Sequence, residues 1–138
     1  RRQRQMCKET GIDAYLQENK DFLLDCNIKE YLRALIREKG ITIVQLASDA
    51  QLSERYCFQL LSLSNPRHPS RDVLLSMCIG MQLNLDETQT ALRIAKLALL
   101  YPKDKRDSIL IYGIEHGKSV MDINELLYHH NLKCLCDS

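Results

Sequence analysis

The chain has 138 residues, of which 45% are hydrophobic, and its formal net charge is +1. This length and hydrophobic content fit a folded globular protein, and the near-neutral charge excludes a global basic field that would attract nucleic acid. No run of about 18 apolar residues occurs, so we expect no membrane contact, and the six scattered cysteines are typical of reduced thiols in a cytoplasmic protein. Since five Gly and three Pro leave little room for the many turns of a β fold, we predict an all-α protein.

Residues 1–26 are predicted to be a basic tail followed by a short helical extension. Arg1, Arg2 and Arg4 make the tail basic, and it is either a solvated end or an arm that follows a phosphate backbone. The apolar residues of the extension fit one or two short helices. Because such a segment is too short for a core of its own, we expect it to pack on the following residues or on a second chain.

The next segment, residues 27–100, is predicted to contain five helices. The first is amphipathic, with Asn27 as its cap, Glu30 in the capping-box position and Gly40 at its end. The second begins at Thr42, which can form a capping box with Gln45.

A third helix over residues 53–63 follows after a short turn, with Ser53 as its cap. At about 100° per residue, its apolar and polar side chains separate onto opposite faces. The buried face of this helix and of the preceding one is predicted to consist of Leu46, Ala47, Ala50, Cys57, Leu60 and Leu61. Arg55, Gln59 and Ser62 point the other way, and a short polar face on a helix held by its neighbour is what reading DNA in the major groove requires.

Two more helices complete this segment after a loop over residues 64–69. Ser70 opens the fourth helix, whose core face we expect to comprise Val73, Leu74, Met77 and Cys78. The fifth is predicted over residues 85–100, with Asp86 as its cap and Gln89 in the capping-box position.

Residues 101–138 are predicted to form a helical hairpin. Pro102 breaks the chain, one helix ends at Gly117, and Ser119 with Asp122 opens the last helix. The apolar stripe of this hairpin either packs on the preceding helices or forms a dimer interface, and both possibilities stay open.

No residues stand out as a metal or catalytic site. The set His129, His130, Cys134 and Cys136 is chemically possible for a soft metal, but its CxC spacing differs from the usual CxxC, and reduced thiols are the favoured interpretation. No Gly-rich phosphate loop, HExxH or GxSxG motif occurs. We therefore predict no metal, no cofactor and no enzymatic activity.

Residues 27–100 resemble the phage-repressor-like, xenobiotic-response-element type of helix-turn-helix bacterial transcription regulators. The residues that carry the resemblance are Leu46, Ala47, Ala50, Leu52, Cys57 and Leu60, together with the loop and helix from Pro66 to Thr88. The resemblance implies a five-helix lambda-repressor-like domain, extended by the N-terminal helical segment and the C-terminal hairpin. One departure is Gln51, at a turn position where the family most often has Gly.

This resemblance implies double-stranded DNA as the partner and residues 53–63 as the recognition helix. Arg55 and Gln59 would pair with guanine and adenine, near Ser53, Glu54 and Tyr56. The residues expected at the phosphate backbone are Thr42, Gln45, Arg67, His68 and Arg71.

The chain is accordingly predicted to be a sequence-specific transcription regulator. A homodimer on a palindromic site is expected because a single recognition helix reads only a few base pairs. The alternative is a protein–protein interaction module that keeps the scaffold without binding DNA, with Tyr56 and Phe58 in a protein-binding patch. The N-terminal and C-terminal helical extensions are the candidate surfaces for a protein partner.

Overall fold

The computed structural model describes residues 27–135, and this part of the chain contains seven helices and no strand. The predicted all-α class is therefore confirmed for these residues. The helices are α2 (Ile28–Lys39), α3 (Ile43–Ala50), α4 (Glu54–Leu61), α5 (Arg71–Gly80), α6 (Leu85–Ile94), α7 (Lys105–Glu115) and α8 (Val120–His129). The predicted basic tail and helical extension of residues 1–26, and Cys136 of the possible metal set, lie outside the described residues.

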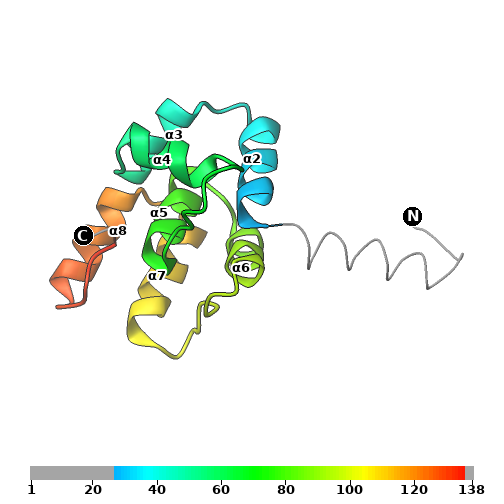
Figure 1. The fold of residues 1–138 in the computed structure, drawn as a ribbon. Helices are drawn as coiled ribbons and strands as arrows, with labels where there is room; N and C mark the ends of the chain where they lie inside the picture. Colours follow the sequence, from blue (N-terminus) through cyan, green and yellow to red (C-terminus); the bar gives the residue numbers. More distant parts are fainter. Residues whose placement is uncertain (1–26, 136–138) are drawn as a thin grey trace, which may run out of the picture.

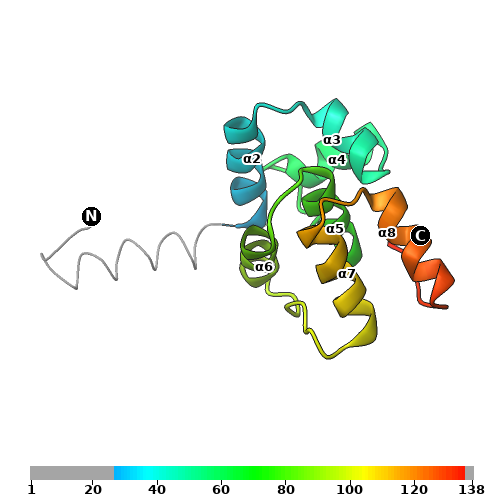
Figure 2. The ribbon, with the colours of Figure 1, turned by 180° about the vertical axis from the view of Figure 1, so that it is seen from behind.

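Helix α5 is the centre of the fold. Every residue from Val73 to Gly80 is buried, because this stretch is apolar or small on all sides. Figures 1 and 2 show α6 and α8 on opposite sides of α5, with α3 and α4 together at one end of the molecule. The connection from α6 to α7 runs around the other end (Figure 1). The pair α3–α4 thus packs on α5 on its inner side, and its outer side faces away from the other helices.

The predicted helix starts agree with the observed caps at five positions. Asn27 and Glu30 form the expected capping box, and the hydroxyl groups of Thr42, Ser53, Ser70 and Ser119 each accept a hydrogen bond from the amide three residues later. Gly40 ends α2 in the left-handed conformation, with φ of 68°. The prediction of a capping box at Thr42 was wrong in one detail, because the Gln45 side chain donates to Asp49 Oδ2 at 3.0 Å.

The predicted helix over residues 85–100 was too long and began with the wrong cap. Asn84, not Asp86, caps α6 and forms a capping box with Glu87. The helix ends at Ile94 because Lys96 takes a left-handed conformation with φ of 61°. Gln89 has a different role from capping: its side-chain amide pairs with both backbone groups of Leu100, at 2.8 and 3.0 Å, and folds residues 95–100 back along α6.

The described part of the C-terminal hairpin packs on the other helices. Leu110, Ile114, Ile123 and Leu127 belong to the same hydrophobic cluster as Leu74. Helices α7 and α8 approach closely at Gly113, where a Cβ atom would lie 2.5 Å from the Ile123 side chain. The described residues before and after the predicted boundary at residue 100 therefore share one hydrophobic core.

Candidate nucleic-acid interface

The turn between α3 and α4 consists of three residues, Gln51 to Ser53. Gln51 has φ of 62°, so a non-glycine residue adopts the left-handed conformation that this turn requires. The Leu52 amide donates to the Ala47 carbonyl at 2.9 Å, and the half-buried Leu52 side chain packs against the core. The Gln51 side chain also donates to the Ser48 carbonyl at 3.2 Å, which ties the turn to the end of α3.

The inner faces of both helices are buried as predicted. Leu46, Ala50, Cys57 and Leu60 are fully enclosed. Helix α3 lies directly on α5, because a Cβ atom added to Gly80 would be 3.0 Å from the Ala50 nitrogen and 3.2 Å from its Cα. Only a glycine permits this approach without a shift of one helix, so Gly80 determines how closely α3 packs on α5.

The outer face of α4 carries a cation and an aromatic ring. Arg55 is exposed and has no hydrogen-bond or ion-pair partner among residues 27–135. Phe58, one turn further along the same face, is 51% exposed. Glu54 and Ser53 are exposed at the start of the helix. Phe58 is not part of the hydrophobic cluster, so its ring is available for contact with a ligand.

Arg67 reaches back from the following loop to α4. Its Nη1 atom donates to Gln59 Oε1 at 2.9 Å, and its guanidinium carbon lies 4.7 Å from the centre of the Tyr56 ring. The loop is fixed at the same point, because the Arg67 amide donates to Asn65 Oδ1 at 2.8 Å. The structure thus brings three predicted site residues, Tyr56, Gln59 and Arg67, into one cluster beside the outer face of α4.

Beneath this cluster lies a buried lysine that sequence reasoning missed. Lys29 is 2% exposed, and its ammonium group donates to the carbonyls of Gln59, Ser62 and Asn65 at 3.3, 2.9 and 2.6 Å. Arg33 Nη1 adds a bond to the Leu61 carbonyl at 3.1 Å. Two cations from α2 therefore satisfy the free carbonyls at the end of α4 and fix the loop that follows.

Burial lowers the pKa of Lys29, whereas three carbonyl acceptors favour its charged form. One sequence signal pointed to this residue: Lys29 lies three residues before Leu32 and seven before Ile36, on the apolar stripe of α2. A lysine on an apolar stripe is more often a solvated residue whose stem covers the core, so the pattern alone could not identify its acceptors.

Arg71 does not lie free at the predicted interface. Its guanidinium forms a bidentate ion pair with Asp107, at 3.3 and 3.1 Å, and donates to the carbonyls of Ala98 and Leu99. Asp107 is buried and also accepts from the Tyr101 amide at 3.0 Å. Arg71 therefore joins α5 to α7 and to the connection between α6 and α7. Of the three arginines predicted at the interface, Arg55 and Arg67 are the two that remain beside α4.

The remaining predicted backbone contacts are exposed. Thr42 and Gln45 are at the start of α3, and His68 is in the loop after Arg67. The Thr42 hydroxyl accepts from the Gln45 amide at 3.0 Å and keeps its own hydrogen for a further acceptor.

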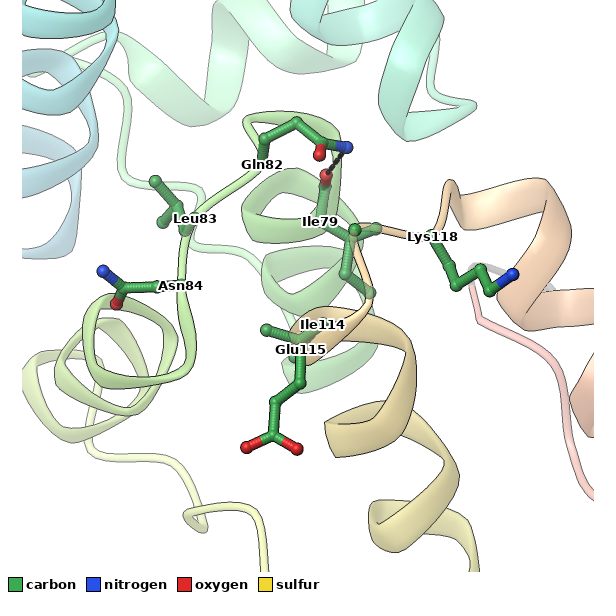
Figure 3. A pocket seen from close by; sticks show the side chains of 8 residues that line it. Ile79, Gln82, Leu83, Asn84, Ile114, Glu115 and Lys118 are labelled. Carbon is green, nitrogen blue, oxygen red and sulfur yellow. Dashed lines mark hydrogen bonds between the residues drawn. The ribbon is translucent and has the colours of Figure 1, made fainter.

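A pocket of the described residues lies elsewhere, between the α5–α6 turn and the end of α7 (Figure 3). Its volume is about 220 Å³, and its lining includes Ile79, Leu83 and Ile114. The Glu115 and Lys118 side chains extend in different directions in Figure 3, so the polar groups do not converge on one point. Among residues 27–135 no group of three or more His, Cys, Asp or Glu side chains is arranged to hold a metal, and no helix is long and apolar enough to span a membrane.

The comparisons with protein families, with curated proteins and with solved structures gave no match for this chain.

Proposed function

We propose that this protein is a sequence-specific double-stranded DNA-binding transcription regulator, with α4 as its recognition helix. Within the predicted residues 53–63, the helix itself comprises Glu54–Leu61, with Ser53 and Ser62 as its caps. The observation that carries the proposal is the outer face of α4, where Arg55 and Phe58 are exposed on a helix that is fixed at both ends. A rigid helix with a free polar face fits the major groove, which admits one α-helix and presents base edges to it.

The side chains of this face suit particular base edges. Arg55 can donate two hydrogen bonds to guanine O6 and N7, and Phe58 can contact the methyl group of thymine. Glu54 can accept from cytosine and repels phosphate, which restricts how the helix start approaches the duplex. Ser53 keeps its hydroxyl hydrogen for an acceptor while its oxygen caps α4.

The exposed groups around α4 are proposed to contact the phosphate backbone. Thr42 and Gln45 would do so from the start of α3, and Arg67 and His68 from the loop after α4. Arg71 is not part of this proposal, because its guanidinium is engaged by Asp107 and two carbonyls.

The proposal also covers the fold of helices α2 to α6 and the assembly of the chain. Helices α2 to α6 would form a five-helix lambda-repressor-like domain, with α3 and α4 as its helix-turn-helix. A homodimer that places two copies of α4 in successive major grooves is the assembly that such a short recognition helix requires.

Titration of a random-sequence duplex at several salt concentrations tests this function. The observed binding constant is expected to fall steeply as salt rises, because each phosphate contact releases counterions. An absence of binding at low salt would sink the proposal.

A second function, a protein-binding module, is favoured by exposed apolar side chains on α3, on α4 and in the loop after α4. Val44, Phe58 and Leu63 are 50%, 51% and 57% exposed. The salt titration separates the two functions, because a protein-binding patch of this kind gives no duplex binding at any salt concentration.

A further inference from the structure

We infer that Gln59 is a positioning residue that holds Arg67 against the DNA backbone, and that it does not read a base. The inference rests on the proposed function and changes what the recognition helix contributes to it. Base recognition is then left to Glu54, Arg55 and Phe58, and the end of α4 positions a cation that binds phosphate.

Two groups of α4 hold the Arg67 guanidinium. Gln59 Oε1 accepts from Nη1 at 2.9 Å, and the Tyr56 ring lies 4.7 Å from the guanidinium carbon. One donor and one face of the guanidinium are therefore occupied by α4. The other N–H groups of this exposed side chain have no partner among the described residues and remain available for phosphate oxygens.

An adenine contact would require both polar atoms of the Gln59 side-chain amide. A bidentate contact uses the amide oxygen to accept from adenine N6 and the amide nitrogen to donate to N7. Gln59 Oε1 is already directed at Arg67, and the Gln59 side chain is only partly exposed. Rotation of the amide toward a base edge would break the hydrogen bond that places Arg67.

One buried group fixes both ends of the Gln59–Arg67 bridge. The Lys29 ammonium binds the Gln59 carbonyl at 3.3 Å and the Asn65 carbonyl at 2.6 Å. Asn65 in turn accepts from the Arg67 amide, and Pro66 restricts the backbone between them. The position of Arg67 relative to α4 is therefore set before any ligand arrives, which reduces the entropy lost on binding.

The test is a double-mutant cycle on a duplex selected by the wild-type chain. Binding constants of wild type, Gln59→Ala, Arg67→Ala and the double variant are measured at about 50 and 200 mM salt. Wild type loses affinity when salt rises from the lower to the higher concentration. The factor by which affinity falls is expected to be about threefold smaller for Arg67→Ala, because one phosphate contact is lost. Gln59→Ala is expected to weaken binding in part, and the double variant to bind like Arg67→Ala alone.

Gln59→Glu separates the two roles most sharply. If Gln59 positions Arg67, the carboxylate keeps hold of the guanidinium but offsets its charge, so the salt dependence becomes smaller and the selected base sequence stays the same. If Gln59 reads adenine, the glutamate changes the preferred base toward cytosine, whose N4 donates to a carboxylate. Arg93→Ala, which removes an exposed arginine from α6, is the control for a general loss of charge.

Three results would overturn the inference while leaving the proposed function intact. These are a changed base preference in Gln59→Ala or Gln59→Glu, losses that multiply in the double variant, and a Gln59→Ala variant that binds like wild type. A wild-type chain that binds no duplex at low salt contradicts the proposed function, and the inference with it. Thermal unfolding of each variant verifies that the compared proteins are folded.

Discussion

At the scale of single residues, a buried cation controls the end of α4. The three carbonyls bound by Lys29 belong to Gln59, Ser62 and Asn65, so one side chain of α2 fixes the helix end and the loop together. A helix end in a protein interior needs such partners, because its last carbonyls have none within the helix. Lys29 is therefore a structural support of the proposed interface that does not touch its ligand.

Replacing Lys29 with methionine keeps most of the side-chain volume and removes the donor. We expect the free energy of unfolding to fall by about 1–3 kcal/mol, because three partly buried carbonyls lose a charged donor. Urea denaturation measures the change, and Lys103→Met, at an exposed position in the loop before α7, is the matched control. An equal stability of Lys29→Met and wild type would contradict the assigned role.

Cys78 gives a pH dependence at the same scale. Burial, and secondly the charge of Glu87, raise the pKa of its thiol to about 12, from 9.0 in the unfolded chain. As pH rises, the thiol ionises in the unfolded chain before it ionises in the folded protein. The free energy of unfolding therefore decreases as pH rises above 9.0. Between pH 8 and pH 10 this thiol is expected to lower the free energy of unfolding by about 1 kcal/mol. Urea denaturation at both pH values should show a smaller decrease for Cys78→Ala than for wild type.

At the scale of elements, the α3–α4 turn contains backbone strain. Gln51 adopts φ of 62°, which costs a non-glycine residue about 1–2 kcal/mol and is only partly offset by its hydrogen bond to Ser48. Gln51→Gly is therefore expected to raise the free energy of unfolding by about 0.5–1 kcal/mol, after the larger entropy of an unfolded glycine is counted. The control is Ser48→Gly within α3, which should lower stability by about 0.5 kcal/mol. A destabilised Gln51→Gly variant would show that the side-chain bond outweighs the strain.

The helices with local signals could be predicted from the sequence. The caps at Asn27, Ser53, Ser70 and Ser119, and the apolar faces of α3 and α4, depend on residues within one or two turns of each other. The cap of α6 was misassigned because Asn84 and Asp86 both precede a suitable partner three residues later. Only the packing of the following residues, held by Gln89, decides where that helix ends.

The predicted site depended more on contacts between distant parts of the chain. Arg55 is exposed as expected from its helix position. The partners of Arg71 and Lys29 are 27 to 36 residues away in the sequence, and no local pattern specifies them. The same is true of the Gln59–Arg67 bond, which depends on how the loop after α4 turns back.

At the scale of the whole molecule, ion pairs connect the hairpin to the central helix. Arg71 binds Asp107 at 3.1 Å, and Arg106 of α7 binds Asp72 of α5 at 3.1 Å. Arg106 also donates to the Lys133 carbonyl at 2.9 Å, so the chain after α8 is tied to the same point. These bonds make α5, α7 and the C-terminal residues of the described chain one unit.

The Arg71–Asp107 pair should therefore affect stability and leave DNA specificity unchanged. Arg71→Ala is expected to destabilise the fold by about 3–5 kcal/mol, because it leaves the buried Asp107 carboxylate without its cation. Asp107→Ala is expected to cost less, because the partly exposed Arg71 keeps its hydrogen bonds to the Ala98 and Leu99 carbonyls. The double variant should lose much less than the sum, which a double-mutant cycle from urea denaturation would reveal. Additive losses would contradict the pairing, and a changed base preference in folded Arg71→Ala would return this residue to the proposed DNA interface.

The central claim is that the outer face of α4 reads duplex DNA, and selection of bound duplexes from a random pool tests it most directly. Wild type is expected to enrich a palindromic sequence, and Arg55→Ala to lose the preference for guanine at one position of each half-site while still binding DNA. A wild-type chain that enriches no sequence, or an Arg55→Ala variant with the same preference as wild type, would contradict the claim.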